Sequence, residues 1–293
     1  MNQKYLKICR YLAAVVVCAS CLACTGCTPR DITPAEESVE QKLQVEIRPV
    51  ELSAEPGNGR MTVQWKREGD GLFSGYNIYI SEQPLTGRGS SSVDADTIAP
   101  FNLLPFPGDT DPADGLETFV AEGLKNGRKY FVSARVINPD RTLSSQSNEV
   151  MVVCGPRGEI KLDARFAGEK DGYSLSKDQY VRADSPENDL YFYHKDGTDY
   201  LASPNRLGGY ARVTRFGKLP FNGDLRSLRS QLRKYPPDPT EDRVVVKSGD
   251  WVMLERSDNT YAVVKVRGFE GTARERKINL FFAYCPLEGA MLF

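Results

Sequence analysis

Four cysteines recur at every third position of the segment CASCLACTGC, at Cys18, Cys21, Cys24 and Cys27. Thiolates at this density are typical ligands of zinc or of an iron–sulfur cluster, which needs its ligands held together in a folded pocket. The segment instead lies in and beside an apolar run, and no second group of Cys and His residues follows it to complete a site. We therefore expect neither a metal nor redox chemistry at these thiols.

The residues around the cysteines indicate a secretory signal. Three basic residues precede an apolar run from Tyr11 to about Cys24, and no acidic residue occurs before Asp31. The run has about 14 residues, fewer than the ~20 that a membrane-spanning helix needs. A permanent anchor by this segment alone is not expected.

The segment resembles the signal of bacterial lipoproteins, in which small residues precede a cysteine that is diacylated and becomes the new amino terminus. Thr25 and Gly26 fit the two positions before Cys27, which is the expected acceptor. Cys24 stands three residues before Cys27, where the family usually has Leu. Cys24 and Cys21 likewise have a cysteine three positions before them. Both therefore remain alternative acceptors.

The resemblance implies that residues 1–26 are a signal peptide and that covalent lipid, such as palmitate, is attached to the amino-terminal cysteine. It implies a lipid-anchored protein of the bacterial cell envelope, facing either the periplasm or the outside. Residues 27–44 are rich in Pro, Glu, Ser and Gln, and we expect a flexible tether there.

The composition indicates two globular domains and no nucleic-acid partner. The chain has 293 residues, of which 40% are apolar and 26% charged. Its 38 Lys and Arg residues balance 39 Asp and Glu residues, and removing the signal peptide takes away three positive charges, which changes the formal charge from −1 to about −4. No positive field would attract nucleic acid, and no motif points to a cofactor.

Residues 45–154 are expected to form an all-β first domain. The segments RMTVQWKR (60–67), GYNIYIS (75–81) and KYFVSARVIN (129–138) alternate apolar and polar residues, and EVMVVC closes the set. Several such strands separated by turn residues indicate a β-sandwich.

This region resembles a fibronectin type III domain, an immunoglobulin-like sandwich. The resemblance rests on Trp65 in the second strand, Tyr76 opening the third, and Leu124 and Tyr130 in GLKNGRKY before a later strand. It implies structural roles for all four residues. Tyr130 would cap a corner by hydrogen bonding to nearby backbone while its ring packs in the core.

The segment between Ser81 and about Glu117 is longer than the usual connection in that family, and long structureless insertions are often functional or disordered. It contains DTDPADG, in which Asp109, Asp111 and Asp114 are a weak candidate site for Ca²⁺. Their spacing is not that of an EF-hand, so a solvated acidic loop is the expected state.

Residues 159–293, after a short linker CGPRGE (154–159), are expected to form a second, mainly antiparallel β domain. Its strand candidates are NDLYFYH and TDYLAS joined by a KDG turn, then RVVVK, DWVMLER, TYAVVKVRGF and KINLFFAY. Many aromatic residues lie in these segments, among them Tyr191, Phe192, Tyr193, Tyr200, Trp251 and Tyr284. Most would pack in the core, and a minority could form an exposed platform for a sugar or a peptide.

One helix is expected, in GDLRSLRSQLRK. Leu225, Leu228 and Leu232 fall on one face, Asp224 is a plausible cap, and Pro236 follows the end. Its basic residues form a stripe that is more often a solvated face than a binding patch; they are Arg226, Arg229, Arg233 and Lys234.

The inventory of catalytic residues is short. His194 is the only histidine, and we expect it to be an exposed residue beside the KDG turn. The chain has no G-x-S-x-G elbow, P-loop, G-x-G-x-x-G or H-E-x-x-H motif, so no catalytic residue is assigned. A pair of carboxylates, as glycosidases use, needs only spatial proximity and stays open.

Cys154 and Cys285 are the only cysteines after the expected acceptor. An oxidising envelope permits a disulfide between them, and two buried free thiols are the open alternative.

These features favour a lipid-anchored, non-catalytic binding or interaction module. The expected partners are the membrane, through the lipid, and a protein or a saccharide. Two alternatives stay open. One is an envelope glycoside hydrolase or other hydrolase with the first domain as accessory, and the other is a structural subunit of an envelope assembly.

Overall fold

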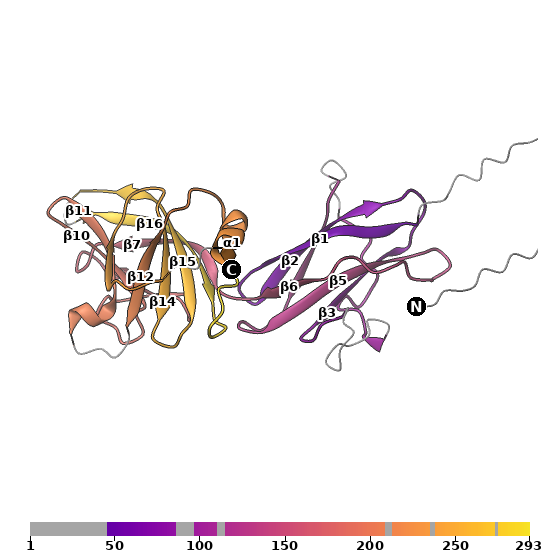
Figure 1. The fold of residues 1–293 in the computed structure, drawn as a ribbon, viewed down its shortest axis with the longest axis horizontal. Helices are drawn as coiled ribbons and strands as arrows, with labels where there is room; N and C mark the ends of the chain where they lie inside the picture. Colours follow the sequence, from indigo (N-terminus) through magenta and orange to yellow (C-terminus); the bar gives the residue numbers. More distant parts are fainter. Residues whose placement is uncertain (1–45, 86–96, 110–114, 209–212, 235–237, 273–274) are drawn as a thin grey trace, which may run out of the picture. The chain divides into compact units, whose positions relative to one another are not determined.

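The computed structural model describes residues 46–85, 97–109, 115–208, 213–234, 238–272 and 275–293. Residues Leu43–Phe293 form one compact unit. The predicted all-β fold class is confirmed, because the described residues form four antiparallel sheets and a single α-helix (Figure 1). No helix in this part of the chain is long and apolar enough to cross a membrane.

Residues 48–153 form what we call the N-terminal sandwich, with two three-stranded sheets of order β1-β2-β4 and β3-β5-β6. The strands are β1 (Arg48–Pro56), β2 (Arg60–Glu68), β3 (Gly75–Ser81), β4 (Glu117–Glu122), β5 (Lys129–Ile137) and β6 (Val150–Val153). The alternating residues Met61, Val63 and Trp65 of β2 are completely buried against apolar residues of the other sheet. The period of two in the sequence therefore positions the core.

Residues 157–285 form what we call the C-terminal sandwich, with two five-stranded sheets. The β10 sheet has the order β13-β11-β10-β8-β9, and the β15 sheet has the order β12-β14-β15-β16-β7. The strands are β7 (Arg157–Asp163), β8 (Gly172–Ser174), β9 (Gln179–Val181), β10 (Leu190–Lys195), β11 (Thr198–Ala202), β12 (Thr214–Leu219), β13 (Arg243–Val245), β14 (Trp251–Arg256), β15 (Tyr261–Glu270) and β16 (Lys277–Cys285). A short 3-10 helix, η2, spans Pro204–Leu207.

Strand β7 (157–163) begins inside the segment 154–159 that the sequence assigned to a linker. It begins at Arg157, which pairs with Ala283 of β16, and the pairing continues to Asp163 opposite Lys277. The Gly and Pro residues before Arg157 end the N-terminal sandwich, but the polar residues of RGEIKLD alternate with buried Ile160 and Leu162. An edge strand with one solvated face has this pattern.

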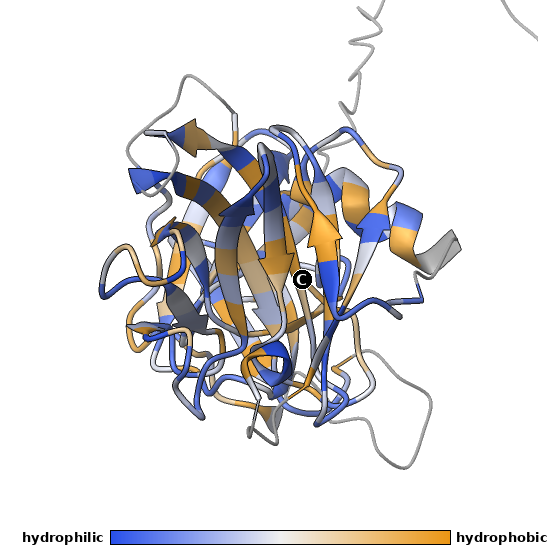
Figure 2. Ribbon diagram, turned by 90° about the vertical axis from the view of Figure 1, so that its left-hand side faces the viewer, coloured by the Kyte–Doolittle hydropathy of each residue, from blue (hydrophilic) through white to orange (hydrophobic). Residues whose placement is uncertain are grey.

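The centre of the β15 sheet is buried on both faces, while the helix-side face stays exposed toward β7 at Arg267 and Glu159. One face packs on the β10 sheet through a core that includes Leu254, Val264 and Phe282. The other face packs under the helix and the last residues of the chain, in a second cluster with Trp251 and Phe293. Figure 2 shows hydrophilic and hydrophobic bands along the strands of this region.

The helix α1 (Leu225–Lys234) forms where the sequence predicted it. The Asp224 carboxylate accepts a hydrogen bond from the backbone N of Ser227 at 2.7 Å, which caps the first turn. Leu228 and Leu232 are buried against the β15 sheet, while Leu225 is partly buried beside them. The apolar stripe therefore docks the helix, and Pro236 lies outside the described residues.

A buried ion pair links the two sheets of the C-terminal sandwich. Arg256 Nε donates to Asp189 Oδ1 at 2.9 Å, with side chains 5% and 0% exposed. The guanidinium also hydrogen-bonds to the hydroxyls of Thr260 and Tyr284. The second Asp189 oxygen accepts a hydrogen bond from the backbone N of Leu175 at 2.7 Å. Each charge is thus both paired and hydrogen-bonded, as burial requires.

We expect Arg256→Met to lower the free energy of unfolding by about 3–5 kcal/mol, because it leaves the Asp189 carboxylate buried without its cation. Urea denaturation measures the change. The matched control is Arg267→Met, which removes an exposed ion pair with Glu159 and should cost at most about 1 kcal/mol. Equal losses in the two variants would contradict the role given to the buried pair.

Candidate functional site

The four residues of the fibronectin-like pattern lie in or against the core of the N-terminal sandwich. Trp65 and Tyr76 are fully buried, with ring centroids 5.0 Å apart. Tyr130 Oη accepts a hydrogen bond from the backbone N of Lys125 at 2.9 Å, and Leu124 packs against the same core. These positions hold the fold together and offer no reactive group to a ligand.

The remaining sequence candidates do not come together in a site. Cys154 and Cys285 are free and buried, and burial raises the pKa of each thiol. The backbone N of Asp109 donates a hydrogen bond to the Glu117 carboxylate. The other candidates lie outside the described residues, namely Asp111, Asp114, Cys21, Cys24 and Cys27. No group of three metal-ligating side chains occurs among the residues that are described.

His194 differs from its expected exposed state, because its side chain is only 21% exposed and points into an ionic cluster. Its Nδ1 lies 2.7 Å from Asp199 Oδ1, and Arg276 Nη2 donates to Asp199 Oδ2 at 2.7 Å. Burial opposes ionisation of Asp199, but hydrogen bonds from Arg276 and His194 outweigh it and lower the pKa of that carboxyl. The cluster joins the β10–β11 hairpin to the start of β16.

The opposite face of the same hairpin carries a group that we call the tyrosine stack, consisting of Tyr193, Tyr200 and Arg243. The two rings are cross-strand neighbours on β10 and β11, 4.7 Å apart and inclined by only 6°. Arg243 of β13 lies over the Tyr200 ring at 5.5 Å and donates from Nη1 to Tyr193 Oη at 3.2 Å. The stack fixes three side chains that all reach solvent.

The chemistry of the stack follows from which parts of the rings stay open. Tyr193 is stacked on the Tyr200 ring, and the Arg243 guanidinium lies over that ring as well. The group places phenolic hydroxyls and a guanidinium at the surface. Arg165, whose guanidinium lies 4.3 Å from the Phe166 ring and 5.9 Å from the Tyr191 ring, extends this aromatic and cationic surface.

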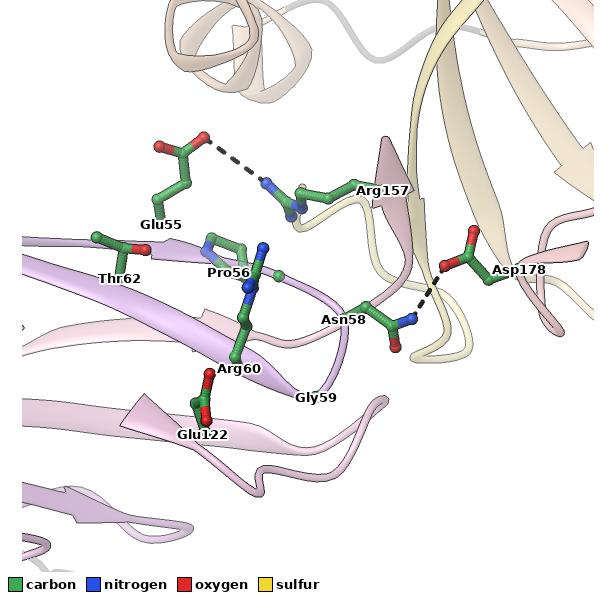
Figure 3. A pocket seen from close by; sticks show the side chains of 10 residues that line it. Glu55, Pro56, Asn58, Gly59, Arg60, Thr62, Glu122, Arg157 and Asp178 are labelled. Carbon is green, nitrogen blue, oxygen red and sulfur yellow. Dashed lines mark hydrogen bonds and ion pairs between the residues drawn. The ribbon is translucent and has the colours of Figure 1, made fainter. Parts of the chain in front are cut away.

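A pocket of about 560 Å³ lies between the β1–β2 turn and the start of the C-terminal sandwich (Figure 3). Three carboxylates line it, but two of them have partners. Glu55 is ion-paired with Arg157, and Asp178 accepts hydrogen bonds from Tyr173 Oη at 2.6 Å and Asn58 Nδ2 at 3.0 Å. The third, Glu122, is exposed. This is not the desolvated acid beside a free carboxylate that glycoside hydrolysis needs.

Arg157 is the poorly satisfied residue of this pocket. Its side chain is 12% exposed, its contact with Glu55 is a long 4.0 Å, and its guanidinium nitrogens make no hydrogen bond to the described residues. Burial, with the nearby charge of Arg229, lowers the pKa of Arg157 to about 10. Such a shift corresponds to roughly 3 kcal/mol of unfavourable free energy when the group is charged.

We expect Arg157→Met to raise the free energy of unfolding by about 1–3 kcal/mol at pH 7, because an apolar side chain of similar volume removes a buried, unsatisfied charge. Chemical denaturation of both proteins measures this. The control Glu55→Gln removes only the long ion pair, whose carboxylate is 64% exposed, and should change stability by less than about 1 kcal/mol. Destabilisation by Arg157→Met would contradict the interpretation.

Comparisons with known proteins add no family. No protein-family model matches the chain, and no curated protein matches it. Among solved structures, the twitchin kinase region from C. elegans matches with 13% sequence identity and a TM-score of 0.28. The match covers 80% of this chain and 39% of that chain, and at this TM-score it carries no argument about fold or function.

Proposed function

We propose that the chain is a lipid-anchored cell-envelope protein that binds a protein partner through the tyrosine stack and performs no catalysis itself. In this proposal Cys27 carries the lipid, residues 28–44 tether the fold, and a fibronectin-type sandwich presents the C-terminal sandwich. The observation that carries the binding role is the stack of Tyr193, Tyr200 and Arg243 on the β10 sheet.

The side chains of the stack support a protein partner over a saccharide. Tyrosine and arginine dominate the energetics of protein interfaces, and they contribute most when they are rigid before binding. A pyranose ring would need an open aromatic face, whereas Tyr200 has Tyr193 and Arg243 against its ring. The cluster of His194, Asp199 and Arg276 holds the hairpin from its inner face, which keeps the stack in place.

We expect Tyr200→Ala to weaken partner binding by about 30-fold or more, which corresponds to a loss of about 2 kcal/mol at an interface hot spot. The partner is first captured with a photo-crosslinking residue at Val245, which pairs with Tyr200 and is 40% exposed. Affinity for the purified partner is then measured by calorimetry.

Two controls separate the outcomes of this experiment. The same crosslinker at Val120, which is 47% exposed on the N-terminal sandwich, should not capture the partner. A glycan array is probed in parallel with the wild type and with Tyr200→Ala. Glycan binding that the substitution abolishes, without any protein captured from Val245, would replace the protein partner with a saccharide.

We expect Cys27→Ser to abolish labelling by a radioactive fatty acid and to release the protein from the membrane fraction. Without covalent acyl chains, which contribute about 0.8 kcal/mol per buried methylene, the chain has no proposed membrane anchor. Cys24→Ser and Cys21→Ser are the matched controls and should keep the label. Unchanged labelling of Cys27→Ser would move the acceptor to one of those two positions.

A further inference from the structure

Three leucines of the N-terminal sandwich are far more exposed than the other large apolar residues described. Leu103 is 99% exposed, Leu72 is 84% exposed and Leu104 is 78% exposed, while the next, Phe166, is 64% exposed. Single exposed leucines are common on protein surfaces, but two consecutive ones at this level in an ordered segment need a reason.

The backbone under Leu103 and Leu104 is held in place by hydrogen bonds. The Asn102 side chain accepts from the backbone N of Ile78 at 2.8 Å and donates to the carbonyls of Tyr76 at 2.9 Å and Leu104 at 2.7 Å. This part of the insertion therefore runs as an ordered segment along β3, in contrast to the structureless insertion that its length suggested. The fold therefore holds the side chains of Leu103 and Leu104 in solvent.

The next anchor of this segment lies two residues further along. Phe106 exchanges two backbone hydrogen bonds with Tyr76, at 2.7 and 2.9 Å. The Phe106 ring packs against Trp65 and Phe119 of the core. Fixed on both sides, the leucines cannot turn inward without breaking these contacts.

The three leucines lie at the end of the N-terminal sandwich where the described chain begins, which we call the entry end. Antiparallel pairing places the start of β1 beside the end of β2, and the short connection 69–74 leads from there to the start of β3. A Cβ on Gly71, the residue before Leu72, would lie 2.9 Å from the Ile47 side chain. A Cβ on Gly75 would lie equally close to Pro105, the residue after Leu104.

The chain upstream limits how far the entry end can be from the lipid. Between the proposed acceptor Cys27 and Glu46 lie the 18 residues 28–45. A chain of this length reaches at most about 60–65 Å. The entry end is then the part of the fold held nearest to the bilayer surface.

We propose that the entry end docks on the lipid surface, with Leu72, Leu103 and Leu104 entering the boundary between headgroups and acyl chains. The inference rests on the proposed lipid anchor and extends it, since it gives the anchored protein a fixed side toward the membrane. Leucine favours this environment and is under-represented among hot spots of protein interfaces, in contrast to the tyrosines and arginine of the stack. Arg67, which lies over the ring of Phe73 next to Leu72, adds a cation suited to headgroup phosphates.

The test places a tryptophan at the entry end of the full, lipidated chain. The two native tryptophans, Trp65 and Trp251, are buried, so they supply a constant background. Leu104→Trp is reconstituted in phosphatidylcholine vesicles whose acyl chains are either brominated or unbrominated. We expect brominated lipid to quench most of the added emission and to shift the remainder to the blue. Leu103→Trp is a second variant with the same expected result.

The matched control is Val120→Trp on β4, in the sheet that does not contain β3, and its emission should not respond to bromine. Fatty-acid labelling is measured on each preparation. Labelled protein without quenching of either leucine variant would overturn the docking and leave the anchor standing. Loss of labelling would overturn both. Concentration-dependent dimers that Leu104→Asp dissociates, without quenching, would assign the entry end to a second copy of the chain.

Discussion

The arrangement of the C-terminal sandwich depends on the centre of the β15 sheet being covered on both faces. Trp251 to Leu254 are buried without interruption, because Val252 and Leu254 face the β10 sheet while Trp251 and Met253 face the helix and the chain end. The covered centre of this sheet offers no surface to a ligand, and its outer part near β7 carries ion pairs such as Arg267 with Glu159. The tyrosine stack stands instead on the outward face of the β10 sheet.

Two buried arginines, Arg256 and Arg157, differ in how well their charges are paired. Arg256 meets a fully buried carboxylate, a hydroxyl and a phenol, so its burial ties the two sheets to each other. Arg157 has only a distant, exposed carboxylate. The paired charge of Arg256 specifies which surfaces of the two sheets pack together. The poorly paired charge of Arg157 destabilises the fold at the start of β7.

Much of the fold follows from local patterns in the sequence. Asp224 and the leucines of α1 predict the helix with its cap, and alternation predicts most strands. The KDG turn also contains more than the sequence analysis used, since a two-residue turn places His194 opposite Asp199 and Tyr193 opposite Tyr200. The pairs Tyr193–Tyr200 and His194–Asp199 were thus predictable. Arg243 and Arg276 were not, because Arg243 lies 50 residues from Tyr193 and Arg276 lies 77 residues from Asp199 in the sequence, and only the tertiary fold brings them together.

Asn102 has a consequence for contacts between copies of the protein. The side-chain amide of Asn102 hydrogen-bonds to the backbone of β3 in the way that a neighbouring strand would. Together with Phe106, it occupies the edge of β3 that would otherwise be free to pair. Open edges are the places where strands of another molecule can pair. With this edge closed by the chain itself, neighbouring molecules cannot extend one another's sheets through β3.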